Sequence, residues 1–255
     1  MSIRARLSDA LSGGKRLADL RHRLEWRVHR RMAGSTTPAQ DRLFATVRPF
    51  TMASYLRLHN VWDLATRAVT DGVPGAFVEC GVWRGGCLGV MAGVAKESGG
   101  RPIWGFDSFE GLPEPGERDC SDAVAYAGGR GSGELSTIGR CVAPIDDVRR
   151  LPFDELGVPE SDVQLVKGWF QDTLPERAAD VGPIAVLRLD GDWYESTRVC
   201  LDHLFDVVQP GGFVILDDYG HWTGCREATD EFLAERGLRV ELHRIDYTGT
   251  WFRKL

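Results

Sequence analysis

The feature that most constrains the fold of this 255-residue chain is a regular alternation of short apolar segments with longer segments of helical pattern. The apolar segments are typical of buried strands and lie at residues 76–81, 102–107, 162–167, 184–190 and 212–218. Helical patterns fit before and between them, at 54–70, 86–97, 145–157, 171–180, 196–208 and 224–236. Strands that alternate with helices favour a doubly wound α/β fold, with a mostly parallel sheet and helices on both faces.

Two further segments modify this plan. Residues 239–246 and 249–254 are rich in β-forming residues and predict an edge hairpin, which brings the sheet to seven strands. Residues 108–144 form a long insertion, rich in glycine and proline, directly after a strand end. Such an insertion is typical either of a mobile lid over an active site or of a disordered surface loop, and both interpretations stay open.

The N-terminal 45 residues predict a basic helical extension to one domain at 46–255. Apolar residues recur at helical spacing over 3–32, with arginines between them. Packing or dimer contact is the preferred role of this helix, and binding to a membrane surface is the minor alternative.

Composition excludes several classes of protein. The net charge of −6 does not favour a nucleic-acid partner. The six cysteines show no CxxC spacing and no signal peptide precedes them, so we expect reduced thiols in a cytoplasmic protein. The longest apolar runs are far shorter than the roughly 20 residues that span a bilayer, so we expect no membrane partner.

The first two predicted strands end in residues that suit a nucleotide-like ligand, because ligands of open α/β sheets bind beyond the carboxyl ends of the strands. Gly81 permits a tight turn there, and Gly85 lets a ligand approach the backbone. Asp107 ends the second strand, where a carboxylate can bind two ribose hydroxyls. The glycine spacing is not the GxGxxG of dinucleotide sites, which favours S-adenosyl-L-methionine over NAD. Glu79 would then meet the ammonium group of this cofactor or position the turn.

Four carboxylates follow the fourth and fifth predicted strands, namely Asp190, Asp192, Asp217 and Asp218. Adjacent parallel strands lie about 5 Å apart and end at the same edge, so these side chains should converge. One aspartate after a strand is usually a helix cap, but two pairs on two strand ends repel one another unless a cation neutralises them. Oxygen ligands without nearby cysteine or histidine favour Mg2+ over zinc. We predict that Asp190, Asp217 and Asp218 bind Mg2+.

This arrangement predicts methyl transfer to a hydroxyl group. Mg2+ would lower the pKa of the hydroxyl, and a carboxylate would remove its proton. The oxygen would then attack the sulfonium methyl of the cofactor in line. We predict Asp192 as the general base. His221 is a rival base, or else a histidine of the surface beside the site.

Five ordered motifs between residues 48 and 235 resemble the macrocin O-methyltransferase (TylF-type) family. They are VECGVWRGG (78–86), GFDSFEGLP (105–113), GWFQDTLP (168–175), RLDGDWYEST (188–197) and LDDY (216–219). The sequence RPFTM (48–52) also resembles the family's segment before the first strand, which folds over the cofactor.

The resemblance implies a Rossmann-like class I methyltransferase fold and an S-adenosyl-L-methionine-dependent enzyme assisted by Mg2+. Its substrate would be a deoxysugar hydroxyl in natural-product (antibiotic) biosynthesis, carried on a small-molecule glycoside or a nucleotide sugar. A homodimer or larger homo-oligomer is also implied. The expected cofactor-binding residues are Thr51, Met52, Glu79, Gly81, Gly85, Asp107, Ser108, Trp169, Phe170 and Asp190. Trp169 and Phe170 would line the adenine pocket, although they could also be aromatic residues of the core.

Two other functions stay open. A catechol-type Mg2+-dependent O-methyltransferase uses the same sheet and acid cluster, but the motifs DGDWYEST and DSFEGLP argue against it. A non-catalytic cofactor-binding or scaffold protein is disfavoured by the full set of four aspartates. Methyl transfer to a free catechol but not to glycosides would support the first alternative.

Overall fold

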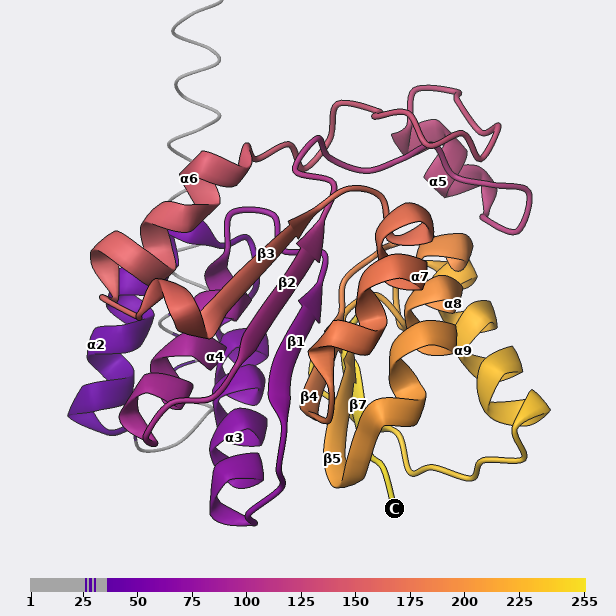
Figure 1. Ribbon diagram of the computed structural model, residues 1–255. Helices are drawn as coiled ribbons and strands as arrows, with labels where there is room; N and C mark the ends of the chain where they lie inside the picture. The colour runs from indigo at the N-terminus through magenta and orange to yellow at the C-terminus, as the bar shows by residue number, and fades with distance from the viewer. Residues whose placement is uncertain (1–25, 27, 29, 31–35) are drawn as a thin grey trace, which may run out of the picture.

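The computed structural model describes residues 26, 28, 30 and 36–255, and a seven-stranded sheet forms its centre (Figure 1). The strands are β1 (Ala76–Cys80), β2 (Ile103–Asp107), β3 (Val163–Lys167), β4 (Ile184–Leu189), β5 (Val208–Leu216), β6 (His243–Arg244) and β7 (Thr250–Arg253). They lie in the order β3-β2-β1-β4-β5-β7-β6. The first five are parallel, whereas β7 is antiparallel to β5 and β6. The predicted fold and the edge hairpin are confirmed.

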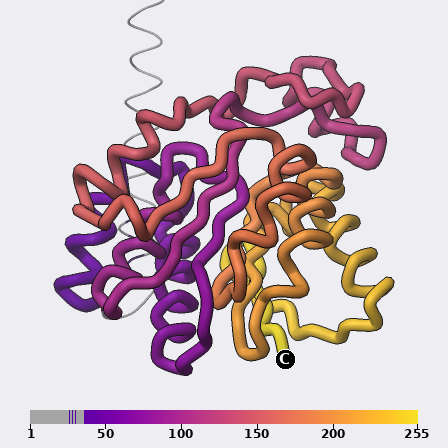
Figure 2. Tube along the Cα trace, viewed as in Figure 1, coloured from indigo at the N-terminus to yellow at the C-terminus, as the bar shows by residue number. Residues whose placement is uncertain are grey.

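Helices cover both faces of this sheet (Figures 1 and 2). On one side lie α2 (Pro38–Val47), α3 (Tyr55–Thr70), α4 (Gly86–Glu97) and α6 (Ile145–Arg150), and on the other α7 (Phe170–Val181), α8 (Tyr194–Leu204) and α9 (Thr223–Glu235). The remaining elements are α5 (Ser121–Tyr126) and four short turns, η1 (Arg48–Phe50), η2 (Leu151–Glu155), η3 (Glu160–Asp162) and η4 (Phe205–Val207). Each face has its own large apolar core.

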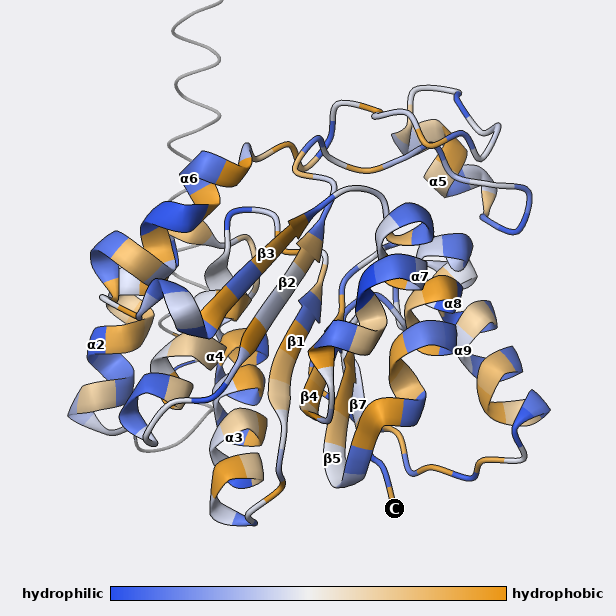
Figure 3. Cartoon of the chain, viewed as in Figure 1, coloured by the Kyte–Doolittle hydropathy of each residue, from blue (hydrophilic) through white to orange (hydrophobic). Residues whose placement is uncertain are grey.

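Burial along the strands follows from their place in the sheet. Every residue of β1 and β4 is buried, because both strands are central and carry helices on both faces. Strand β3 lies at the edge and is only partly buried: Val163 and Val166 are buried, whereas Gln164 and Lys167 are exposed. Figure 3 shows hydrophobic colour along much of the sheet and hydrophilic patches on the helices that cover it.

Some elements differ from the predictions. The sequence analysis missed α2, although Thr37 caps it by accepting a hydrogen bond from the N–H of Gln40 and Pro38 begins it. The predicted helix 145–157 is α6 followed by the π-helical turn η2, which contains Pro152.

The predicted N-terminal extension is only partly visible. Its basic helix over 3–32 lies outside the described residues, apart from helical positions 26, 28 and 30. Phe44 and Val47 of α2 are buried in the same core as α4, so the described part of the extension packs on the domain. The boundary at residue 45 stays a prediction. Among the described helices, none combines the length and the hydropathy needed to cross a membrane.

The insertion 108–144 lies beyond the carboxyl ends of the strands (Figures 1 and 2). It is held on the first turns of α8 and α9. Asp119 accepts a hydrogen bond from the backbone N–H of Tyr194 at 2.9 Å, and the indole N–H of Trp193 donates to the carbonyl oxygen of Pro113 at 3.0 Å. Ala123 of α5 packs in an apolar cluster with Trp193 and Trp222. The structure therefore places the insertion over the strand ends, and its movement as a lid stays a prediction.

Gly81 brings the ends of β1 and β4 together. Its N–H donates to the carbonyl oxygen of Phe106, and the N–H of Asp190 donates to the carbonyl oxygen of Cys80. Gly81 has a φ of 89°, and a Cβ at this position would lie 1.8 Å from the carbonyl oxygen of Asp190. Only glycine fits both the left-handed backbone and this approach.

We therefore expect Gly81→Ala to lower the melting temperature by more than 10 °C, roughly the effect of several kcal/mol in a chain of this size. The matched control is Gly72→Ala, because Gly72 also has a positive φ, 67°, but has no atom within 4 Å of the added Cβ. That control should cost only the backbone strain of about 1–2 kcal/mol. Equal melting temperatures for the two variants would show that the contact with Asp190 is unimportant.

Candidate active site

Asp107 holds the turn that follows β1. Its carboxylate accepts hydrogen bonds from the backbone N–H groups of Val82 at 2.7 Å, Trp83 at 2.9 Å and Phe109 at 2.6 Å. Burial raises the pKa of Asp107, and these three N–H donors act in the opposite direction. The residue predicted to bind ribose thus also orders the loop around the ligand site.

A first cavity, here called the turn cavity, lies beside this loop and encloses about 600 Å³, partly open to solvent. Seven of the predicted cofactor residues line it: Met52, Gly81, Asp107, Ser108, Trp169, Phe170 and Asp190. Gln171 and Ser196 also line it, and the sequence analysis did not single them out. Residues from four of the five ordered motifs, together with Met52 of the segment RPFTM, therefore meet in one cavity.

A second cavity, here called the acidic cavity, measures about 1020 Å³ and is also partly open. Thr51 and Glu79 line this cavity rather than the first one. It shares Asp190 and Asp192 with the turn cavity, so the two cavities are adjacent. Gly85 lines neither cavity, because it caps the start of α4 with a φ of 89° and faces Val148.

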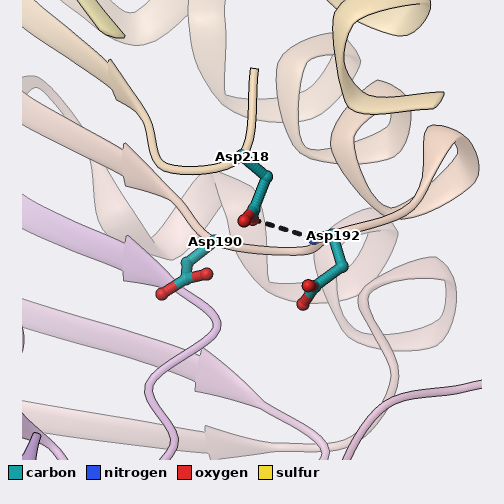
Figure 4. A group of neighbouring side chains, drawn as sticks. All are labelled: Asp190, Asp192 and Asp218. Atoms are coloured by element: carbon teal, nitrogen blue, oxygen red, sulfur yellow. Dashed lines mark hydrogen bonds between the residues drawn. The ribbon is translucent and has the colours of Figure 1, made fainter. Parts of the chain in front are cut away.

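Three carboxylates converge where the two cavities meet. Asp190 and Asp192 follow β4, Asp218 follows β5, and their side chains point into the same space (Figure 4). One oxygen from each lies within 4.8 Å of the others. The backbone N–H of Asp192 also donates to the Asp218 carboxylate at 3.3 Å.

Burial and repulsion from neighbouring carboxylates raise the pKa values of Asp192 and Asp218. The pKa of Asp192 rises to about 7, chiefly through burial and then through the charge of Asp190. The pKa of Asp218 rises well above its ordinary value, through burial and through the charge of Asp192. A cation bound beside Asp192 and Asp218 would favour their ionised forms. Three hard oxygen donors this close suit a divalent cation such as Mg2+.

Asp217 does not join this group. One of its oxygens accepts from Arg188 at 2.5 Å and the other from Arg57 at 2.5 Å. The set that the structure brings together is therefore Asp190, Asp192 and Asp218, whereas the sequence predicted Asp190, Asp217 and Asp218. The reason is that consecutive residues after a strand point to opposite sides, and Asp217 points toward the two arginines. The ligand role of Asp217 stays a prediction.

Arg188 is the buried cation of the site. From β4 its guanidinium donates to Glu79 at 2.6 Å, to Asp190 at 2.9 Å and to Asp217 at 2.5 Å. Removing one partner of such a buried ion pair typically costs about 3–5 kcal/mol. The sequence analysis missed this residue, although an arginine inside the apolar run 184–190 was a signal.

Arg57 ties the site to the edge of the sheet. Arg57 lies in α3, and its Nη1 donates to Asp217. Its Nε donates to Asp246 at 2.9 Å. Asp246 in turn accepts from the backbone N–H groups of Thr248 and Gly249 in the turn before β7. Nothing in the sequence around Arg57 indicated this contact, because its partners lie about 160 and 190 residues away.

His221 lies at the wall of the acidic cavity, where it is exposed to solvent. Its ring lies 4.3 Å from the ring of Trp222. Asp192 is much better enclosed and lines both cavities. The structure therefore keeps both candidate bases near the site and places Asp192 closer to its centre.

Comparison with known proteins identifies relatives of this arrangement. The model of the macrocin-O-methyltransferase (TylF) family matches residues 12–254. The 8-demethyl-8-(2,3-dimethoxy-alpha-L-rhamnosyl)-tetracenomycin-C 4'-O-methyltransferase of Streptomyces olivaceus is 40% identical over 80% of this chain and 75% of its own length. The demethyldecarbamoylnovobiocin O-methyltransferase of Streptomyces niveus is 37% identical over the same shares, 80% and 75%. Among solved structures, the O-methyltransferase NovP is 34% identical, with a TM-score of 0.70 over 80% of this chain and 82% of that one.

The three-carboxylate group predicts a measurable cation site. We expect Asp218→Asn to raise the Kd for Mg2+, measured by calorimetry, by tenfold or more, because it removes a charged oxygen ligand. Asp180→Asn is the matched control, since Asp180 is an exposed carboxylate on α7 paired with Arg177; its Kd should not change.

The same titration tests Asp217. Asp217→Asn should also weaken Mg2+ binding if this side chain leaves its arginines for the ion. An unchanged titration would remove Asp217 from the ligands, and an unchanged titration of Asp218→Asn would contradict the site itself.

Proposed function

Because this chain belongs to the macrocin-O-methyltransferase (TylF) family, we propose that it transfers the methyl group of S-adenosyl-L-methionine to a hydroxyl of a deoxysugar, with assistance from Mg2+. The observation that carries the proposal is the junction of the two cavities at Asp190 and Asp192. A cavity suited to a nucleoside there opens onto a carboxylate group suited to a divalent cation.

The turn cavity fits the adenosine part of the cofactor. Trp169 and Phe170 would offer aromatic rings to the adenine, and Asp107 would offer a hydrogen-bond acceptor to the ribose. When bound, the cofactor supplies a methyl group on a positively charged sulfur, which an oxygen nucleophile can take.

Glu79 fits the amino-acid part of the cofactor. Its Oε2 is buried, and within the described part of the chain it has no hydrogen-bond partner. Burial raises the pKa of Glu79 to about 8, against the opposing effect of Arg188. A cationic ammonium group in the acidic cavity would give this carboxylate both a donor and a second positive charge. Thr51 and Met52 line the same cavity and complete the predicted cofactor contacts.

The carboxylate group fits Mg2+, which when bound would lower the pKa of an acceptor hydroxyl by Lewis acidity. Asp190 and Asp218 would hold it from two strand ends. Asp192 would accept the proton of the hydroxyl, because it lines both cavities directly beside Asp190. Main-chain geometry keeps Asp192 in place, since its φ is 58° and its N–H donates to Asp218. The rest of the site aligns the acceptor with the cofactor and excludes water.

The acceptor is proposed to be a glycoside in natural-product biosynthesis. Two relatives support this: one acts on a rhamnosyl tetracenomycin, and another is the mycinamicin III 3''-O-methyltransferase of Micromonospora griseorubida, which is 34% identical to this chain. Self-assembly into a homodimer or larger oligomer and a cytoplasmic location remain predictions from the sequence.

A panel of acceptors tests the reaction. We expect methyl transfer, detected by mass spectrometry, to at least one of three acceptors: 8-demethyl-8-(2,3-dimethoxy-alpha-L-rhamnosyl)-tetracenomycin C, demethyldecarbamoylnovobiocin and mycinamicin III. Excess chelator should abolish this transfer, and added Mg2+ should restore it. TDP-rhamnose tests the nucleotide-sugar alternative, and catechol tests the catechol-type alternative. Transfer to catechol alone, or full transfer in chelator, would contradict the proposal.

The base assignment has its own test. Asp192→Ala should lower kcat by at least about a hundredfold, the usual share of general base catalysis, while calorimetry shows cofactor binding within about threefold of the parent. His221→Ala is the comparison, and it should keep most of its turnover. The reverse pattern, with near-normal turnover of Asp192→Ala, would move the base role to His221.

A further inference from the structure

Trp222 touches the proposed base, and the sequence analysis gave it no role. It lies at the N-cap of α9 and is 7% exposed. Its indole N–H donates to Oδ1 of Asp192 at 2.8 Å. Among the described residues, this is the single hydrogen bond that the Asp192 carboxylate accepts. One oxygen of the proposed base is therefore fixed, and the other is left for the reaction.

The same ring is packed beneath the insertion 108–144. Its centroid lies 5.7 Å from that of Tyr126, the last residue of α5, and 5.0 Å from that of Trp193. Ala123 of α5 belongs to the same buried cluster, and Leu112 and Ile138 from the flanking parts of the insertion pack against it. Displacing the insertion would therefore remove much of what holds the indole in place.

The other attachments of the insertion leave Asp192 untouched. The Trp193 indole donates to Pro113, and Asp119 accepts from the backbone of Tyr194. Arg118 pairs with Glu231 of α9 at 2.6 Å. Docking of the insertion and orientation of Asp192 can thus be perturbed separately, because Trp222 is the residue that takes part in both.

We propose that Trp222 is a positioning residue that orients the Asp192 carboxylate when the insertion is docked over the strand ends. This inference rests on the proposed function, in which Asp192 is the base. A carboxylate held by an indole N–H has one rotamer and one free oxygen, and it acts on an acceptor hydroxyl at a set angle. Without the N–H the carboxylate can rotate, and the fraction of enzyme with a correctly aimed base falls. The acceptor and the cofactor still bind.

Two matched variants separate the hydrogen bond from the packing. Trp222→Phe keeps an aromatic ring in the cluster and removes the N–H, whereas Trp193→Phe removes an indole N–H in the same cluster that does not reach Asp192. With the best acceptor of the panel above, Trp222→Phe should lower kcat by 10- to 100-fold and leave the acceptor KM and the Kd for S-adenosylhomocysteine within threefold. Trp193→Phe should keep kcat within threefold. Equal kcat for the two variants would overturn the inference, whether both fall or neither does.

The coupling to the insertion has a readout that does not need turnover. Hydrogen exchange of the backbone in 121–126 should be unchanged in Trp222→Phe and faster in Trp222→Ala, which also removes the packing. In nitrogen-15-labelled protein, the indole N–H signal of Trp222 should shift in Asp192→Ala while that of Trp193 stays in place. If the indole N–H signal of Trp222 stays in place in Asp192→Ala, the hydrogen bond on which the inference depends is contradicted.

A double variant distinguishes this inference from the proposed function. If Trp222 acts through Asp192, adding Trp222→Phe to Asp192→Ala leaves the residual turnover unchanged. If Trp222→Phe lowers turnover by the same factor in Asp192→Ala as in the parent enzyme, the inference is overturned and the base assignment stays intact. Near-normal turnover of Asp192→Ala alone overturns both.

Discussion

Charge balance at the carboxyl ends of β1, β4 and β5 is the constraint on which the site depends. Five carboxylates line the acidic cavity, and two guanidinium groups oppose them. Arg188 binds Glu79, Asp217 and one oxygen of Asp190. Arg57 binds the other oxygen of Asp217. Asp192 and Asp218 form no ion pair within the described residues. The carboxylates without an ion pair are therefore Asp192, which also lines the turn cavity, and Asp218, and a divalent ion bound between them would stabilise their ionised forms.

The topology places these carboxylates beside the turn cavity. Strand β1 lies between β2 and β4, so the glycine turn after β1 has Asp107 on one side and Asp190 on the other. The close approach at Gly81 lets the backbone after β4 bend across the end of β1. Asp190 then lines both cavities, and Asp192 reaches the junction through a left-handed backbone. A methyl donor in the turn cavity and an ion at these carboxylates would therefore lie next to each other, because neighbouring strands of the sheet carry the two sites.

The sequence predicted the fold, and it pointed to seven of the residues that line the turn cavity, because both depend on local patterns. Buried strands, the glycine turn and the acids after strand ends are all visible in short segments such as 78–86 and 188–192. The partners of those acids were not visible. That Asp217 faces Arg57 depends on packing between residues 160 positions apart, and that Asp192 joins Asp190 and Asp218 depends on one left-handed residue. The position of the insertion 108–144 could not be predicted from the sequence either. Contacts with α8 and α9 hold it over the strand ends, and its own sequence pattern does not show them.

The most direct test of this account is the position of a divalent ion. Crystals grown with Mn2+ and S-adenosylhomocysteine, with data collected at the manganese absorption edge, would locate it by anomalous scattering. The account predicts one strong peak within about 2–2.5 Å of carboxylate oxygens of Asp190 and Asp218, on the side of the cavity that faces the cofactor sulfur. Full cofactor occupancy with no anomalous peak at these carboxylates, or with a peak elsewhere on the chain, would contradict it.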